Sequence, residues 1–313
     1  MSPLQGYGKL LPILPYECPT NTIQASGDLG APILNELIQS NLFNITVLTR
    51  ASSSAEFPDS VRVVRVDYSS IPDLTAALSG QDAVVSVLTT EAMELQLGLI
   101  EASIAAGVKR FIPSEFGSDC GNPKASKLPV YQPKIAVHKA LKERARAHPG
   151  FSYTLIRNGV FLDWAMKRNF IVDFASDTPA FFDGGDRPFS ATTLATVGQA
   201  VVGVLRNPNE TRNRVVFVHD MIITQRKILK VAQTVAPQRK WDPVTVKTTD
   251  LEAASQKNYD NGEFDMKSSM GFLMRAVFGE GYGGEFKNVD NELLGITGKT
   301  DNDLKALVQE ALA

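Results

Sequence analysis

The chain has 313 residues, enough for one large α/β domain with a smaller substrate-covering region. Its 32 lysine and arginine residues against 34 acidic residues give a net charge of -2, which excludes a field that would gather nucleic acid or an anionic membrane surface. Cys18 and Cys120 fit neither a disulfide framework nor a zinc-ligand spacing, and no apolar run suits a membrane span or a secretory leader. We therefore expect a cytoplasmic protein without a metal site.

The first recognisable segment is a glycine turn that leads into a helix. In QASGDLGAPILNELIQS, at 24–40, apolar positions form one stripe, and two glycines stand at the helix entrance. Free N–H groups and the helix dipole at such an entrance favour a pyrophosphate. We therefore predict a dinucleotide-binding turn made of Ala25, Ser26, Gly27, Asp28, Leu29 and Gly30. A glycine-rich helix cap without a ligand explains the same residues about equally well.

Two features of this region depart from the dinucleotide-binding fingerprint. Gln24 stands where the fingerprint has its tight-turn glycine, and it costs free energy if the turn requires positive φ. The preceding PYECPTNTI, at 15–23, has two prolines and several polar residues where a central strand should be apolar. We therefore expect a poorly specified first strand, which 10–14 could replace only through an irregular connection, and an altered chain start or impaired cofactor binding.

Further along, short β-branched runs alternate with amphipathic helical stretches, and this alternation is typical of a parallel sheet. Helices are predicted from Pro72 to Gly80, from Glu91 to Gly107 and from Lys134 to Ala147. Strands are predicted at 45–50, 61–67, 82–88, 109–116 and 153–159. Right-handed crossovers then give an α/β fold, a Rossmann-type doubly wound parallel sheet whose ligand crevice lies at the carboxyl ends of the strands.

The strand at 45–50 ends in Thr49 and Arg50, which places a guanidinium where the adenosine ribose of a dinucleotide would lie. No acidic residue is there to take the 2′-hydroxyl, and an arginine favours the 2′-phosphate of NADP(H). A solvated arginine at a strand end is the alternative. Asp67, which ends the next strand, could approach the adenine or simply begin a turn.

After Phe161, strands and helices no longer alternate as regularly. Helices are predicted at 196–205 and 225–235, and a strand at 215–220. We therefore expect an NAD(P)-binding Rossmann domain over 1–160 and a smaller substrate-binding lobe over 161–313, with elements that return to the sheet. Either a monomer or a homodimer fits this organisation.

The most specific motif is AGVKRFIPSEFGSD, at 106–119, and SGDLG, VLTR and YTLIRNGVFLDW accompany it in order and spacing. Through these motifs the chain resembles the isoflavone-reductase-like and NmrA-like atypical short-chain dehydrogenases, including fungal members, and the likeness covers most of the chain. The resemblance implies an NADPH-dependent reductase acting on a carbonyl or conjugated double bond of a small, aromatic metabolite. In the plant reductases a lysine early in the helix after the SEFG loop is the proposed catalytic residue, and Lys134 holds that position. At the mouth of a partly dry crevice, a lysine can donate a proton or polarise a carbonyl.

Two residues near this motif depart from the patterns of related enzymes. Tyr131 and Lys134 are two residues apart, so they are not the YxxxK pair of classical short-chain dehydrogenases, and we expect Tyr131 to pack or to line the substrate. His138 replaces an arginine of the plant members and could meet a substrate oxygen without clamping it. Asn158 is predicted at the cofactor, and Phe161 and Trp164 at the substrate. Core packing explains the two aromatic residues equally well.

Three functions fit these patterns. The first is the NADPH-dependent reductase, which the presence of Lys134 favours. The second is a dinucleotide-sensing regulatory protein of the NmrA-like kind, which binds the cofactor without turnover. The third is an inactive paralogue whose pyrophosphate cradle is spoiled by Gln24 and the missing first strand.

Overall fold

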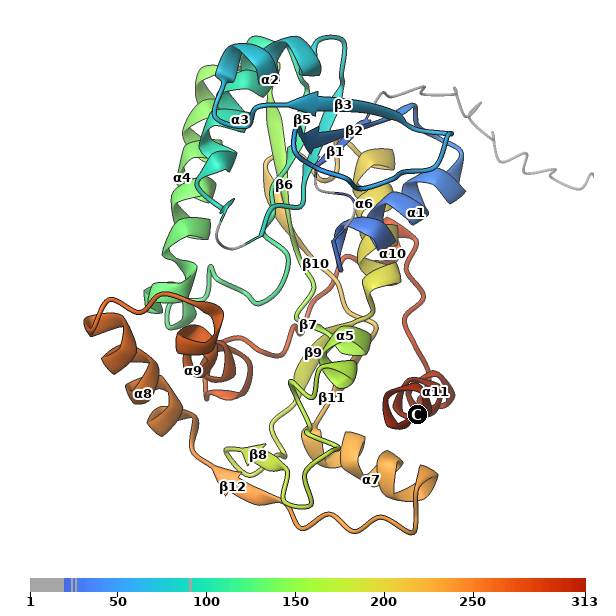
Figure 1. Ribbon diagram of the computed structural model, residues 1–313, viewed down its shortest axis with the longest axis vertical. Coiled ribbons are helices and arrows are strands. Elements are labelled where there is room, and N and C mark those ends of the chain that lie inside the picture. Colours follow the sequence, from blue (N-terminus) through green and yellow to red (C-terminus); the bar gives the residue numbers. More distant parts are fainter. Residues whose placement is uncertain (1–19, 24, 26, 90–91) are drawn as a thin grey trace, which may run out of the picture.

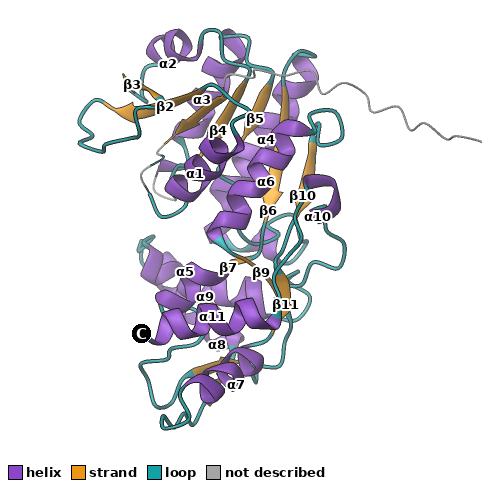
Figure 2. Ribbon diagram, turned by 90° about the vertical axis from the view of Figure 1, so that its right-hand side faces the viewer, coloured by secondary structure: helices purple, strands orange, loops and turns teal. Residues whose placement is uncertain are grey.

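The computed structural model describes residues 20–23, 25, 27–89 and 92–313. A sheet with helices on both faces forms one half of the molecule, and a smaller group of strands and helices forms the other (Figures 1 and 2). All strands of the main sheet run parallel, in the order β10-β6-β5-β4-β1-β2-β3. Their bounds are Thr20–Ile23 (β1), Ile45–Arg50 (β2), Arg62–Val66 (β3), Ala83–Ser86 (β4), Arg110–Ile112 (β5), Ser152–Arg157 (β6) and Arg214–Phe217 (β10). The predicted doubly wound sheet is confirmed, and its order reverses between β1 and β4.

Helices cover the two faces of this sheet. On one face α1 (Gly30–Ser40) packs against α6 (Leu194–Arg206), and α10 (Asn291–Leu294) packs on α6. The other face carries α2 (Ile71–Leu78), α3 (Leu95–Ala105) and α4 (Gln132–Ala147). Each layer buries its own apolar cluster against the sheet, as strands covered on both faces require.

The first strand corrects one expectation. Thr20–Ile23 forms β1 at the centre of the sheet, paired with β2 on one side and β4 on the other, so the strand is present where we expected it to be missing. It begins directly after Pro19, so its four residues avoid the prolines, and three of them are β-branched. Backbone pairing on both sides can order such a short segment although its composition is polar. Gln24, Ser26 and the segment at 10–14 lie outside the described residues.

Predicted helix ends agree closely with the structure where they can be compared. Ser70 caps α2 by accepting a hydrogen bond from the Asp73 amide, and Gly80 follows the helix with φ at +77°. The helix predicted from Glu91 is described from Leu95 and ends at Ala105, before the left-handed Gly107. The helix predicted from Lys134 starts two residues earlier, at Gln132, because Pro133 occupies its first turn.

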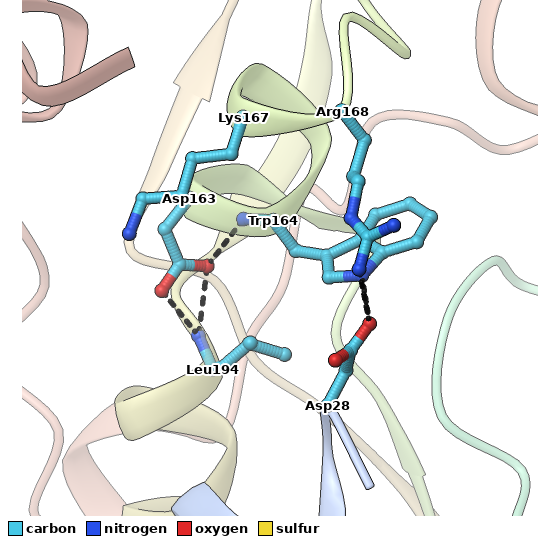
Figure 3. Close-up of a pocket in the computed structure, with 6 residues that line it drawn as sticks. All are labelled: Asp28, Asp163, Trp164, Lys167, Arg168 and Leu194. Atoms are coloured by element: carbon cyan, nitrogen blue, oxygen red, sulfur yellow. Dashed lines mark hydrogen bonds and ion pairs between the residues drawn. The ribbon is translucent and has the colours of Figure 1, made fainter. Parts of the chain in front are cut away.

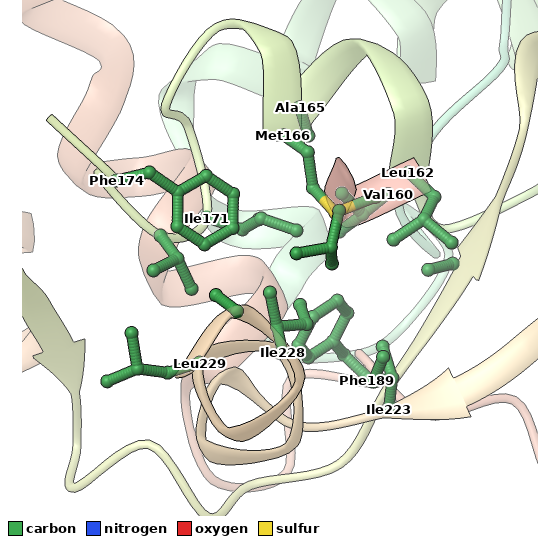
Figure 4. Packing of buried hydrophobic residues seen from close by; sticks show 14 of the residues in the cluster. Val160, Leu162, Ala165, Met166, Ile171, Phe174, Phe189, Ile223, Ile228 and Leu229 are labelled. Atoms are coloured by element: carbon green, nitrogen blue, oxygen red, sulfur yellow. The ribbon is translucent and has the colours of Figure 1, made fainter. Parts of the chain in front are cut away.

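The smaller lobe is built around a three-stranded sheet of β7 (Val160–Phe161), β9 (Phe189–Thr192) and β11 (Met221–Ile223). Figure 4 shows its core, in which Met166, Phe189 and Ile228 interdigitate. A second small sheet pairs β8 (Ala180–Phe182) with β12 (Val244–Val246), and the helices are α5 (Leu162–Lys167), α7 (Gln225–Val235), α8 (Thr248–Asp260), α9 (Met266–Phe278) and α11 (Asp301–Leu312).

The chain passes between the two halves several times. After β9 it returns to cover the main sheet with α6 and to add β10 beside β6, then leaves again for β11. The short helices η2 (Ala125–Lys127) and η3 (Pro129–Tyr131) pack against α9 and share an apolar cluster with it. Within the described ranges, no helix combines the length and apolar character that a membrane crossing requires.

Candidate functional site

Four predicted site segments meet at one edge of the main sheet. Parallel strands end at the same edge, so the turn after β1, the end of β2, the loop after β5 and the residues after β6 all lie there. Their described residues include Ala25 and 27–30, Arg50, 113–119 and Asn158 respectively. The topology therefore brings the described cofactor candidates of these segments and the SEFG loop to the same edge of the sheet.

The start of α1 has the features of an anion-binding helix entrance. Its N-cap is Leu29, whose side chain has no hydrogen-bond acceptor, and its first turn holds no acidic residue. By contrast, the side-chain oxygens of Thr193, Thr224 and Thr300 cap α6, α7 and α11. Gly27 is exposed, whereas Ala25 and Gly30 are buried against the sheet. The Ala31 amide donates to the Gly27 carbonyl at 3.0 Å and Pro32 has no N–H, so Gly30 is the first-turn residue whose amide finds no acceptor among the described residues.

Arg50 is exposed at the end of β2 and makes no ion pair with any described residue. Its charge lies near Tyr68, whose hydroxyl donates to the Leu48 carbonyl at 2.9 Å. Burial raises the pKa of Tyr68, and the Arg50 charge opposes that shift. A guanidinium without an acidic partner is free to meet an anionic group of a ligand.

Asp67 is exposed and shapes the turn between β3 and α2. Its carboxylate accepts hydrogen bonds from the Ser69 amide at 2.9 Å and the Ser69 hydroxyl at 2.6 Å. The bonds from the hydroxyl and then the amide lower the pKa of Asp67. The turn-forming role is therefore present in the structure, and the cofactor role of Asp67 stays a prediction.

Lys134 reaches from the first turn of α4 into the loop after β5. Its ammonium group donates to the carbonyl oxygens of Glu115 at 3.0 Å and Phe116 at 2.7 Å. An ammonium has three N–H groups, so these bonds leave one that no described residue takes up. The side chain is half-buried, which partly shields its charge from bulk water.

The backbone next to Lys134 is fixed by Gly117 and Asn158. Gly117 has φ at +121°, a backbone conformation that residues with a side chain rarely adopt. Its amide donates to the Asn158 side-chain oxygen at 2.9 Å. Its carbonyl accepts from the amides of Asn158 and Gly159. Asn158 is fully buried, and its side-chain amide group donates to the Gly159 carbonyl. Asn158 therefore holds the loop in place, and its direct contact with the cofactor stays a prediction.

A buried charge cluster, which the sequence did not single out, lies behind this loop. Arg157, at the end of β6, makes ion pairs with Glu115 at 3.3 Å and with Asp119. The Cys120 thiol donates to the Glu115 carboxylate at 2.6 Å, and burial, reinforced by the Glu115 charge, raises the pKa of Cys120 to about 12. Arg157 and Glu115 are almost fully buried. The acidic residues of SEFGSD and the arginine of YTLIRNG thus bind each other, which ties the two segments together.

Tyr131 and His138 pack against the core around Lys134. Tyr131 is buried in a cluster with Leu128 and Phe272, and burial raises its pKa, so its side chain acts in packing. The His138 ring meets the edge of Tyr153, with ring centroids 6.0 Å apart. Burial lowers the pKa of His138, with the Glu115 charge opposing, so the imidazole is neutral near pH 7.

Phe161 and Trp164 have different surroundings. Phe161 is half-buried and packs against the apolar cluster between the main sheet, α1 and α6. Trp164 lies on α5, and its indole N–H donates to the Asp28 carboxylate at 2.7 Å (Figure 3). Sequence reasoning placed Trp164 at the substrate, but the structure brings it to the predicted pyrophosphate turn, a contact between residues 136 positions apart that no local pattern reveals.

Comparison with known proteins places the chain in a family. A family model for NAD(P)H-binding proteins matches residues 25–208. Oxidoreductase poxI of Penicillium oxalicum is 36% identical over 301 residues, which cover 91% of this chain and 92% of that protein. The chain therefore belongs to the NAD(P)H-binding family, in which it is related to a fungal oxidoreductase.

Solved structures support the same conclusion for the fold. AtPrR2, solved with NADP+ and (+)pinoresinol, superposes with a TM-score of 0.75 at 20% identity, covering 94% of this chain and 99% of that chain. A structure from work on pinoresinol-lariciresinol and phenylcoumaran benzylic ether reductases, and their relationship to isoflavone reductases, gives a TM-score of 0.77 at 17% identity over the same shares. The predicted isoflavone-reductase-like fold is thereby confirmed, and NAD(P)H is the cofactor class of the family.

Proposed function

We propose that this chain is an NADPH-dependent reductase acting on a carbonyl or conjugated double bond of a small aromatic metabolite. The observation that carries the proposal is the ammonium of Lys134, held by two backbone carbonyls at the sheet edge where the predicted cofactor turn lies. A charge fixed there, with one N–H group left over, suits proton donation to a reacting oxygen.

The described residues fit a dinucleotide phosphorylated on the adenosine ribose. The start of α1 has no side-chain cap and no acidic residue in its first turn, so the positive end of its dipole and the Gly30 amide can receive a diphosphate. Arg50 has no acidic partner among the described residues and stands at the strand end where the ribose phosphate would lie. When bound, the reduced nicotinamide supplies a hydride.

Lys134 would act on the oxygen of the substrate. Reduction of a carbonyl carbon places negative charge on its oxygen, and an ammonium within hydrogen-bond reach stabilises that charge and donates a proton to it. For a conjugated double bond, the same charge develops on the oxygen of the conjugated carbonyl. His138 is neutral near pH 7 and points to Tyr153, so we assign proton transfer to Lys134 and not to the imidazole.

An aromatic substrate is supported by the relatives and by Phe161. The neighbour AtPrR2 was solved with (+)pinoresinol, an aromatic compound. Half-buried Phe161 follows β6, at the sheet edge where the predicted cofactor turn lies, and an aromatic ring could stack on it there. His138, Phe161 and Trp164 were the predicted substrate residues, and we retain Phe161 as the best placed of them.

The cofactor is tested by titrating NADPH and NADH into the protein while following nicotinamide fluorescence. We expect tighter binding of NADPH than of NADH. Arg50→Ala should weaken NADPH binding about ten-fold or more and leave NADH binding unchanged, because only the 2′-phosphate meets the guanidinium. An absence of NADPH binding at millimolar concentration would contradict the proposal.

The role of Lys134 is tested by turnover on a panel of aromatic ketones and enones. Lys134→Ala should lower kcat about 100-fold or more while leaving the Kd for NADPH unchanged, since general acid catalysis contributes on that scale. Lys139→Ala, an exposed lysine on the same helix, is the matched control and should keep full activity. Tight NADPH binding without turnover on any compound would instead favour a regulatory protein.

A further inference from the structure

A contact between the two halves of the molecule lies at the predicted pyrophosphate turn. The Asp28 carboxylate accepts from the Trp164 indole N–H at 2.7 Å and pairs with the Arg168 guanidinium at 3.2 Å. The guanidinium also lies over the Trp164 ring, 5.8 Å from its centroid. Figure 3 shows Trp164 on α5 and Arg168 at the C-terminal end of this helix, with both side chains turned toward Asp28. The surrounding pocket, of about 220 Å³, is lined by Asp28, Asp163, Trp164, Lys167, Arg168 and Leu194.

The position of Asp28 poses an electrostatic problem for the proposed function. Asp28 lies one residue before the N-cap of α1, where the diphosphate of a dinucleotide would bind. A free carboxylate beside a doubly negative group raises the free energy of the complex. The Arg168 charge and the indole donor both engage the same carboxylate oxygen, so they offset its charge and hold it on the side of α5.

We propose that Arg168 and Trp164 are positioning residues for the cofactor, which raise its affinity by neutralising and fixing Asp28. This inference rests on the proposed function, because it requires a dinucleotide at the start of α1. Arg168 itself does not contact the phosphates. Its effect passes entirely through Asp28, so the effect must disappear when Asp28 carries no charge.

A double-mutant cycle on the full chain tests this inference, with the Kd for NADPH measured by nicotinamide fluorescence. Arg168→Ala should weaken binding about two- to five-fold, the scale of an exposed ion pair. In an Asp28→Asn background, the same substitution should leave the Kd unchanged, because the asparagine no longer repels the diphosphate. Trp164→Phe keeps the ring but loses the N–H donor, and should weaken binding in the same direction.

Lys227 provides the matched control. It lies on α7, is exposed like Arg168, and pairs with Asp301 at 2.6 Å and not with Asp28. Lys227→Ala should therefore leave the Kd for NADPH unchanged.

Three results would overturn the inference. An equal loss from Arg168→Ala in both backgrounds would make Arg168 a direct phosphate ligand. A changed melting temperature with an unchanged Kd would make the contact structural only. If the wild-type chain bound no NADPH, the proposed function would fail together with the inference, and this result is distinguishable from the other two because they require binding by the wild type.

Discussion

Glu115 and Arg157 illustrate how single residues in a motif can serve the site without touching a substrate. A buried charge without its partner costs several kcal/mol, so each member of the cluster depends on the others. The cluster ties the loop after β5 to the end of β6, and that loop supplies the two carbonyls that hold Lys134. The acidic residues of the SEFGSD motif therefore serve to fix the conformation of the loop.

The reaction rate of the Cys120 thiol measures whether this cluster is enclosed in the folded protein. With its pKa at about 12, the thiol of the folded protein should react with iodoacetamide at pH 8 about a thousand-fold more slowly than a free cysteine. Mass spectrometry of a Cys18→Ser variant would measure the rate at the remaining cysteine, with the urea-unfolded chain as the reference for full reactivity. Rapid modification of the folded protein would show that the thiol is not enclosed as described.

At the scale of elements, the connection between β6 and β7 leaves no room for a side chain at Gly159. Gly159 has φ at +66°, and a Cβ at this position would lie 2.1 Å from the Ser190 carbonyl oxygen of β9. Strands β6 and β9 belong to different sheets, so this close approach is where the two sheets join. No side chain fits without displacing backbone.

Gly159→Ala should therefore lower the free energy of unfolding by about 3 kcal/mol or more, through both positive φ and the clash with β9. Urea denaturation followed by circular dichroism would measure the loss. Gly150→Ala is the control, because nothing lies within 4 Å of a Cβ there and its φ is not positive, so its stability should change little. Equal stability of the two variants would contradict the described packing.

The sequence predicted most of the sheet but little of the site's internal geometry. Long β-branched runs such as 45–50 signal buried parallel strands by themselves, and β2 has the predicted bounds. β1 could not be predicted, because Thr20–Ile23 is too short and polar for a periodic signal and depends on pairing with both neighbours. The contacts of Trp164 with Asp28 and of Arg157 with Glu115 join residues 136 and 42 positions apart, so no local pattern indicates them.

At the scale of the whole molecule, the predicted domain boundary near residue 160 raises a testable question. The main sheet takes its last strand, β10, from beyond that boundary, and α6 covers the face that also carries α1. A fragment of residues 1–160 would lack both and would expose the apolar residues that pack between α1 and α6, among them Ile33 and Leu37.

We therefore expect the 1–160 fragment to fail to fold alone, and the full chain to unfold in a single cooperative transition. Near-ultraviolet circular dichroism and analytical ultracentrifugation of the fragment would check the first expectation, and calorimetry of the full chain the second. A soluble monomeric fragment with native-like tertiary signals would contradict it and establish the first 160 residues as an independent folding unit.

The repeated passage of the chain between its halves also bears on how such a protein can diversify. A substrate lobe attached by one linker could be exchanged between genes by recombination at a single junction. Here an exchange of residues 161–313 would also replace β10 and α6, and with them part of the sheet that holds the cofactor turn. New substrate preferences in this architecture should therefore arise by substitutions and loop replacements within the lobe, and not by grafting a foreign half.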